Sequence, residues 1–162
     1  MAVSYAYLES PIGELLISAD KVGLQQILFP TDGRPARPDL AWQEDASALA
    51  DVIGQLKAYF AGELESFALT LSPQGTPFQQ RVWGELQKIP YGETISYGEL
   101  ARRIGNPKSS RAVGLANGSN PIPIVIPCHR VIGSNGKLTG YGGGLPIKER
   151  LLALEKRQLR LL

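Results

Sequence analysis

Short runs in which apolar and polar residues alternate open the chain and predict β-strands. The segments between the runs, at 10–13 and 20–23, hold Gly, Pro or Asp and are typical of turns. Because each turn is short, we expect neighbouring strands to pair antiparallel in a small meander. A surface loop with three prolines follows at 30–38. The expected strands are residues 3–8, 14–18 and 24–29.

Apolar residues next recur at helical spacing over residues 46–60. Ala61-Gly62 would end this helix, and residues 67–71 form a further possible strand. No residue pattern in this half of the chain indicates chemistry, which favours a supporting scaffold. The apolar face of the helix would consist of Leu49, Val52, Ile53, Leu56 and Phe60.

A segment rich in turn residues, 72–76, marks the expected boundary between two domains, residues 1–75 and residues 76–162. Thr76 can cap a helix that has Pro77 at its first position. Pro90-Tyr91-Gly92 would stop the chain from continuing as a helix. The apolar positions of this segment are Phe78, Val82, Leu86 and Ile89.

Two short helices joined by a tight turn follow, which is the pattern of a helix-turn-helix. Ser96 is the expected N-cap of the first helix, with Glu99 completing a capping box. The turn is formed by residues 105–107, and a serine of the pair 109–110 caps the second helix, residues 111–117. Basic residues cluster around this turn: Arg102, Arg103, Lys108 and Arg111.

The second of these helices has few side chains that could read base edges in a major groove. Ala112 and Ala116 form one pair of small residues four positions apart, and Gly114 and Gly118 form another. Glycine costs about 1 kcal/mol in a helix interior, so a compensating role is expected. Tight packing on another helix and close approach of DNA, with Arg111 projecting from the helix start, both remain open.

Residues 133–136, Gly-Ser-Asn-Gly, are typical of a hairpin turn and predict that 130–132 pairs with 137–139. A glycine-rich loop at 140–144 then carries one aromatic ring, Tyr141. The ring could stack on a base, or the loop could only link elements.

A last helix is expected to open at Pro146, with Ile147, Leu151, Leu154 and Leu159 facing inward. Glu155 lies four and eight positions from Leu151 and Ile147, on or near the buried face. A buried carboxylate needs a partner, and His129 or a nearby Arg or Lys could supply it. A solvated Glu155 remains the alternative. Together these elements predict an α+β protein. A small N-terminal domain with an antiparallel sheet and a helix precedes a mostly helical, winged-helix-like C-terminal domain with the helix-turn-helix.

The net charge of +2 hides an asymmetry between the halves. Residues 1–75 hold four Lys or Arg and ten Asp or Glu, a net charge of −6, whereas residues 76–162 hold thirteen and five, a net charge of +8. A basic domain of this kind indicates a polyanionic partner, with nucleic acid favoured. No run approaches the ~20 apolar residues of a membrane span, and no leader peptide is recognisable, so we expect a cytoplasmic protein without a membrane partner.

Cys128 and His129 are the only cysteine and the only histidine, and they are adjacent after a proline. A lone cysteine is usually a small buried hydrophobe, and one cysteine cannot form an internal disulfide, which suits a reducing compartment. On an extended chain the two side chains would point to opposite faces, so their contact needs a bend or a bridging water. Two ligands are too few for structural zinc, and a cysteine protease needs a histidine distant in sequence.

Over residues 76–157 the chain resembles the O6-alkylguanine-DNA alkyltransferases. One short motif would be weak support for this resemblance, whereas the ordered set is specific. The residues that carry it are Ser96-Tyr97-Gly98-Glu99-Leu100-Ala101, Arg111-Ala112-Val113-Gly114, Asn120-Pro121-Ile122-Pro123-Ile124, Pro127-Cys128-His129-Arg130-Val131 and Tyr141-Gly142-Gly143-Gly144.

The resemblance implies a stoichiometric repair reaction without a cofactor. Some relatives hold a zinc in the N-terminal domain, but this chain lacks the ligands, so we expect no metal. Cys128 would accept the alkyl group as a thioether, and His129 would take the thiol proton through a water. Glu155 would orient the histidine. Tyr97 would donate a proton toward the departing guanine, and Asn120 would tie the recognition helix to the active-site loop.

The resemblance also implies that the protein binds double-stranded DNA from the minor-groove side and flips the damaged nucleotide out. Arg111 would act as the finger that fills the vacated space. Small residues on the same helix would permit close approach: Ala112, Gly114, Ala116 and Gly118. The substrate pocket would be formed by Val131, Tyr141, Gly142 and Gly143.

Departures from the family pattern and rival functions complete these expectations. Arg150 stands where many relatives have tryptophan, and Gly142 where several have serine or alanine. O4-alkylthymine is a second substrate to consider, and we expect a monomer in solution, with cooperative binding on DNA left open. The alternatives are a non-catalytic lesion-binding protein and a helix-turn-helix regulator in which Cys128 senses redox state.

Overall fold

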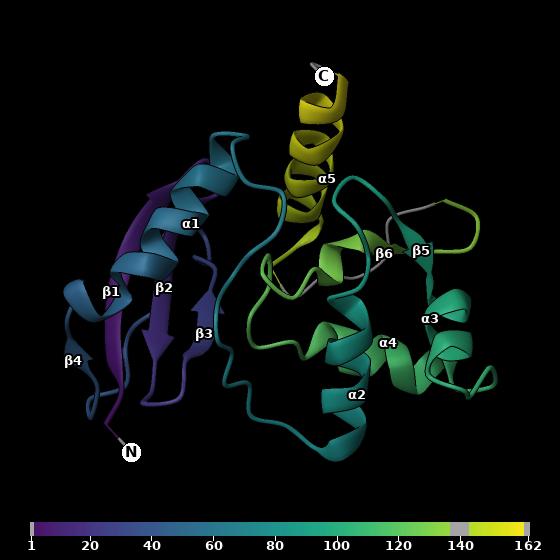
Figure 1. The fold of residues 1–162 in the computed structure, drawn as a ribbon, viewed down its shortest axis with the longest axis horizontal. Coiled ribbons are helices and arrows are strands. Elements are labelled where there is room, and N and C mark those ends of the chain that lie inside the picture. Colours follow the sequence, from purple (N-terminus) through teal and green to yellow (C-terminus); the bar gives the residue numbers. More distant parts are fainter. Residues whose placement is uncertain (1, 137–142, 161–162) are drawn as a thin grey trace. The chain divides into compact units, whose positions relative to one another are not determined.

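The computed structural model describes residues 2–136 and 143–160, with the side chains of the last helix described as far as residue 157. The chain forms two compact units, Met1–Gln74 and Gly75–Leu162 (Figure 1). None of the helices in the described ranges is long and apolar enough to cross a membrane. The α+β class expected from the pattern of residues is confirmed.

The first unit is built on a four-stranded sheet in the order β3-β2-β1-β4. Strands β1 (Ser4–Ser10), β2 (Gly13–Ala19) and β3 (Leu24–Leu28) form the expected antiparallel meander. Strand β4 (Gln43–Glu44) pairs parallel to β1 at the edge of the sheet and was not expected. Both of its residues are exposed and polar, so it has no alternating pattern that sequence could reveal.

A helix covers one face of this sheet (Figure 1). The expected helical segment divides into a short 3-10 helix, Ser47–Leu49, and α1, Ala50–Phe60. Tyr59 is buried rather than Phe60. Tyr59 follows Val52 by seven positions and therefore shares its face of the helix.

The strand expected at residues 67–71 is absent, a correction with a local cause. Only Leu71 makes a bridge, to Leu24. The amide side chain of Gln55 on α1 instead satisfies both backbone groups of Ala68: Gln55 Nε2 donates to the carbonyl and Oε1 accepts from the amide. Because the N–H and carbonyl of Ala68 are already bonded to the Gln55 side chain, they are not available for hydrogen bonds to a neighbouring strand.

The second unit begins with α2, Pro77–Leu86, whose N-terminus is a complete capping box. Gln79 N donates to Thr76 Oγ1, and Thr76 N donates to Gln79 Oε1. The inner face of α2 includes Trp83, which is 1% exposed and donates from Nε1 to the carbonyl of Ala116 at 2.8 Å. Phe78, expected on this face, is only half-buried.

Helices α3 (Tyr97–Arg103) and α4 (Ser110–Gly118) form the expected helix-turn-helix, with Gly105 at a φ of +83° in the turn. Ser96 caps α3 through the Glu99 amide, but the predicted capping box is incomplete. The Glu99 carboxylate bonds to Arg102 and Arg103 instead. At α4 the N-cap is Ser109, and its side chain makes no cap bond.

A small parallel sheet and a long helix complete the second unit. Strand β5 (Ile95–Ser96) pairs with β6 (Val131–Ile132). The hairpin partner expected at 137–139 and the side chain of Leu159 lie outside the described residues. Helix α5, Leu145–Arg160, buries Leu151 as expected, while Ile147 and Leu154 are half-buried.

We predict that Thr76→Ala lowers the free energy of unfolding by about 1 kcal/mol, because the α2 N-terminus loses its capping side chain. Urea-induced unfolding measures the loss. Ser109→Ala is the matched control, since Ser109 holds an N-cap position without a cap bond and loses only an exposed hydrogen bond to the Asn106 carbonyl. Equal losses in the two variants would contradict the role of the capping box.

Candidate active site

The only cysteine lies in a short 3-10 turn, Cys128–Arg130, rather than on an extended strand. Cys128 is 4% exposed, and its carbonyl accepts a hydrogen bond from Asn117 Nδ2 on α4 at 3.4 Å. With three residues per turn, adjacent side chains diverge by about 120° rather than pointing to opposite faces. The local bend thus brings Cys128 and His129 closer to a common side than a strand would.

The loop that leads into this turn is strained and held by one side chain. Ile124 is buried and has a φ of +75°, which a β-branched residue rarely adopts. Such a conformation costs about 1–3 kcal/mol and needs support from its surroundings. Asn120 supplies support on both sides: Nδ2 donates to the Ile126 carbonyl at 2.7 Å, and Oδ1 accepts from Ile122 N at 2.9 Å.

His129 and Glu155 form a buried pair between the turn and α5. The imidazole is 0% exposed and the carboxylate 1%. His129 Nε2 lies 2.7 Å from Glu155 Oε2. Sequence left the partner of Glu155 open. Both His129 and Arg130 bond to its carboxylate, and the alternative of a solvated Glu155 is wrong.

Arg130 completes the surroundings of the carboxylate. Its Nε and Nη2 donate to the two oxygens of Glu155 at 2.9 and 3.0 Å, and its Nη1 donates to the Ile89 carbonyl at 2.7 Å. The guanidinium also lies over the ring of Tyr91, 5.6 Å from its centroid. The Gly92 amide adds a hydrogen bond to Glu155 Oε1 at 3.1 Å. One carboxylate therefore joins α5, the turn and the segment after α2.

The electrostatics of the pair decide where its protons lie. Burial alone would raise the pKa of Glu155, but the hydrogen bonds of His129 and Arg130, with the charge of the guanidinium, lower that pKa to about 2. Burial lowers the pKa of His129 and outweighs the opposing effect of Glu155. At neutral pH we therefore assign an ionised Glu155 and a neutral His129 that donates from Nε2.

This assignment leaves the other imidazole nitrogen as an acceptor. His129 Nδ1 is buried and has no hydrogen-bond partner within the described residues. A neutral imidazole with a free acceptor nitrogen, directly after a cysteine in one turn, can take a proton from the thiol. The arrangement is suited to nucleophilic chemistry at sulfur.

Helix α4 presents one face outward and packs the other against the unit. Its outward positions are Arg111, Ala112, Leu115 and Gly118, and the Gly114 position is half-buried. A Cβ at Gly114 would lie 3.8 Å from the Tyr97 ring, an ordinary contact, and one at Gly118 would meet nothing within 4 Å. Packing inside the protein therefore does not require these glycines. Ala116 is 4% exposed beside Trp83, so its side chain cannot serve the outward face for which it was predicted.

The remaining predicted residues divide between described and undescribed segments. Tyr97 is half-buried as the first residue of α3. Val131 is fully buried behind the cysteine turn, and Gly143 is half-buried. Tyr141 and Gly142 lie outside the described residues.

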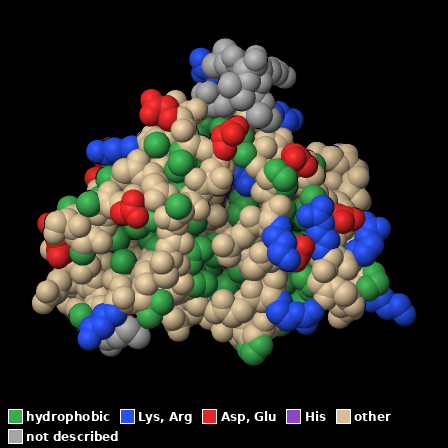
Figure 2. Space-filling view, viewed as in Figure 1, with side chains coloured by type: hydrophobic (Ala, Val, Ile, Leu, Met, Phe, Trp, Pro, Cys, Tyr) green, Lys and Arg blue, Asp and Glu red, His purple; other side chains and the backbone are tan. Residues whose placement is uncertain are grey.

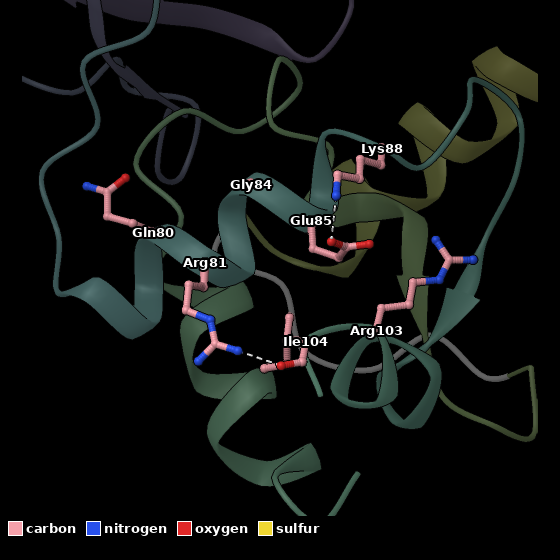
Figure 3. Close-up of a pocket in the computed structure, with 7 residues that line it drawn as sticks. All are labelled: Gln80, Arg81, Gly84, Glu85, Lys88, Arg103 and Ile104. Atoms are coloured by element: carbon pink, nitrogen blue, oxygen red, sulfur yellow. Dashed lines mark hydrogen bonds and ion pairs between the residues drawn. The ribbon is translucent and has the colours of Figure 1, made fainter. Parts of the chain in front are cut away.

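Basic side chains gather on the surface over α3, interspersed with acidic ones (Figure 2). An open cleft of about 350 Å³ lies there between α2 and the end of α3 (Figure 3). Arg81 points to the Ile104 carbonyl and Lys88 to Glu85, so these cations already have partners. The lining residues are Gln80, Arg81, Gly84, Glu85, Lys88, Arg103 and Ile104. None of them belongs to the cysteine turn, and the cleft is separate from that site.

A metal centre finds no support in the described part of the chain. No group of three or more His, Cys, Asp or Glu side chains there is arranged to hold a metal ion. His129 Nε2 is bonded to the Glu155 carboxylate, and Nδ1 is buried.

Comparison with known families now bears on this site. Residues 77–157 match the family described as 6-O-methylguanine DNA methyltransferase, DNA binding domain, and residues 3–73 match its ribonuclease-like domain. The chain belongs to the 6-O-methylguanine DNA methyltransferase family. The resemblance predicted over residues 76–157 is thereby confirmed, and the match extends to the N-terminal half of the chain.

Curated relatives are similar over nearly their whole length. The methylated-DNA–protein-cysteine methyltransferase of Methanosarcina acetivorans is 56% identical over 151 residues, which cover 93% of this chain and 97% of that protein. The protein of the same name from Mycolicibacterium paratuberculosis is 54% identical and covers 96% of this chain and 93% of that protein. The crystal structure of Mycobacterium tuberculosis OGT in complex with DNA superposes with a TM-score of 0.89 at 50% identity, over 96% of this chain and 94% of that chain.

Several residues around the cysteine turn were not predicted from the sequence. Arg130 and Lys148 are buried at 6% and 0% exposure, although charged residues are normally expected at the surface. Asn117 contacts the cysteine turn from α4. The position of Arg130 directly after the Cys-His pair was the one sequence signal that could have revealed its role. No sequence signal pointed to Lys148 or Asn117.

We predict that stability depends on the protonation of Glu155 at acid pH. Its folded pKa of about 2 lies below the ordinary value, so its contribution is full above about pH 5 and is lost as pH falls toward 2. The stability advantage of the wild type over Glu155→Gln should narrow by about 2 kcal/mol between about pH 5 and pH 3. Urea unfolding at each pH measures it.

Glu149→Gln is the matched control, since Glu149 is an exposed carboxyl on the same helix. Its stability should run parallel to that of the wild type over this range. A constant difference between wild type and Glu155→Gln would contradict the assignment of Glu155 as the ionised partner.

Proposed function

We propose that this protein is a single-turnover DNA repair protein that transfers the alkyl group of O6-alkylguanine in duplex DNA to its own Cys128. Family membership supports methyl transfer from DNA to a protein cysteine. The observation that carries the assignment to Cys128 is the buried turn in which His129, bonded to Glu155, leaves Nδ1 as an acceptor. Cys128 is also the only cysteine of the chain.

The reaction uses one thiol proton and one carbon–oxygen bond. The proton of Cys128 passes to His129 Nδ1 through a water, and the sulfur attacks the alkyl carbon. The S–C bond forms as the C–O6 bond breaks, and guanine leaves with the bonding pair. A proton from Tyr97 neutralises the departing base, and the imidazolium returns the proton to the phenolate. Cys128 is left as a thioether, which ends the activity of that molecule.

Two residues position this chemistry. Glu155, ionised and held by Arg130, keeps His129 in the tautomer that can accept from the thiol. Asn120 holds the strained loop before Cys128 and follows α4 closely in the chain, so it couples the two segments. Val131, Gly143, Tyr141 and Gly142 are the residues proposed for the pocket.

DNA approaches the outward face of α4 from the minor-groove side. Arg111 begins that face and would fill the space of the flipped nucleotide. Gly114 and Gly118, which internal packing does not require, keep the helix thin for a groove about 6 Å wide. Arg102 and Arg103 are paired with Glu99 in partly exposed ion pairs, which are weak enough to exchange for phosphate contacts.

The remaining parts of the proposal concern the whole chain. Residues 1–75 form the scaffold domain and residues 76–162 the reactive, DNA-binding domain. O4-alkylthymine is included as a second substrate, with no order of preference, and the protein acts as a monomer in solution that can bind DNA cooperatively. The need for a free thiol supports a cytoplasmic location. The retained Cys128, with its neutral histidine, argues against a purely lesion-binding protein and against a redox-sensing regulator.

We predict that an oligonucleotide with one O6-methylguanine transfers its methyl group to Cys128 with one event per protein molecule. Mass spectrometry of the digested protein locates the added methyl, and chromatography of the DNA shows restored guanine. Cys128→Ser is the control and should bind the same DNA without transfer. Methylation at another residue, or tight binding without methylation of the wild type, would overturn the proposal.

We predict that Arg111→Ala lowers the rate of methyl transfer from duplex DNA by at least about tenfold, while reaction with free O6-benzylguanine is nearly unchanged. Only the duplex requires base flipping, whose cost is a few kcal/mol. Single-turnover rates with both substrates measure the effect. Arg157→Ala removes an exposed charge elsewhere and is the matched control; equal losses on both substrates in Arg111→Ala would contradict the finger role.

A further inference from the structure

A fully buried lysine lies beside the cysteine turn, and the proposed reaction does not yet use it. Lys148 is in the first turns of α5 and is 0% exposed. Its Nζ donates to the Val131 carbonyl at 2.7 Å. Burial of an ammonium costs several kcal/mol unless partners compensate, and a methionine would fill similar space without that cost. We therefore expect the positive charge of Lys148 to have a function.

Val131 directly follows the turn Cys128–Arg130, so the hydrogen bond holds the lysine charge at the end of the turn that carries the sulfur. Val131 is itself fully buried, and the ammonium is thus shielded from water on this side. In such surroundings a positive charge acts more strongly on nearby ionisable groups than it would in solvent.

The other charged groups around the turn already have assigned tasks. Arg130 binds both oxygens of Glu155, and the neutral His129 donates to the same carboxylate. Burial lowers the pKa of Lys148, while negative charge on Cys128 raises it. Electrostatic coupling is reciprocal, so the ammonium favours a negative sulfur to the same extent. The charges of Arg130 and Lys148 both disfavour an imidazolium at His129.

We propose that Lys148 is the buried cation that stabilises the thiolate of Cys128, which makes it a positioning residue of the transfer reaction. This inference rests on the proposed function. His129 accepts the thiol proton, and Lys148 keeps its own proton throughout and offsets the negative charge left on sulfur. Once the S–C bond forms, the sulfur is uncharged and this attraction ends.

The ultraviolet absorbance of the thiolate tests the proposal without DNA or an alkyl donor. Because Cys128 is the only cysteine, the signal reports one group. Cys128→Ser supplies the baseline that tyrosine ionisation contributes. The same pH series is then repeated for the single-turnover rate with free O6-benzylguanine.

Two substitutions separate charge from hydrogen bonding. Lys148→Met removes both, whereas Lys148→Gln removes the charge and keeps an N–H donor for the Val131 carbonyl. Lys156→Met is the matched control, because Lys156 is exposed on the same helix. Thermal unfolding confirms that each variant is folded. If Lys148→Met does not fold, the Lys148→Gln variant alone tests the proposal.

The expected result is a rise of about one pH unit or more in the thiolate midpoint of both Lys148 variants. The transfer rate at neutral pH falls about tenfold and recovers as pH rises, with Lys156→Met unchanged. An unshifted midpoint in Lys148→Gln, with or without a shift in Lys148→Met, would overturn the proposal and leave the lysine as an anchor of Val131. If the thiolate midpoint of the wild type lies below that of both Lys148 variants but the wild type transfers no methyl group, the proposed function would instead be refuted.

Discussion

The buried carboxylate of Glu155 is the constraint on which the second unit depends. It accepts hydrogen bonds from His129, Arg130 and the Gly92 amide, and so joins three segments that are remote in the sequence. A buried ion pair is costly unless every lone pair finds a donor. Here the fork of the arginine and the imidazole satisfy both oxygens, and the ionised carboxylate in turn decides which nitrogen of His129 carries the proton.

Strain and support are combined in the loop before the cysteine. Ile124 adopts a backbone conformation that its branched side chain disfavours, and the two hydrogen bonds of Asn120 span it. Because Asn120 comes just after α4 and bonds to the loop before Cys128, a displacement of α4 would be transmitted to the turn that carries Cys128. In this chain α4, the strained loop and the cysteine turn follow one another within residues 110–130.

Sequence reasoning succeeded where a local rule applies. The capped start of α2, the meander and the helix-turn-helix follow from turn residues and apolar spacing within a few positions of one another. It failed where a distant partner decides. The segment at 67–71 is not a strand, and Gln55 binds its backbone instead. Ala116 lies on the packed side of α4, where Trp83 of α2 donates to its carbonyl. Tyr59 is buried in place of Phe60, and its ring packs against that of Phe67, which comes from the segment after the helix.

The order of motifs alone predicted the family and the pairing of His129 with Glu155, which the comparisons and the structure confirm, and it singled out Cys128 as the proposed acceptor. Those identities follow from residue types at given positions, which the sequence states directly. Only the tertiary structure decided the protonation states of Glu155 and His129 and the position of Lys148. The low pKa of Glu155 results from the hydrogen bonds and charge of its partners, His129 and Arg130, which outweigh its burial. The neutral His129 results from burial. The docking of α5 brings Lys148 to the Val131 carbonyl, at the end of the cysteine turn. Burial and charge proximity are properties of packed segments, so no local pattern along the chain encodes them.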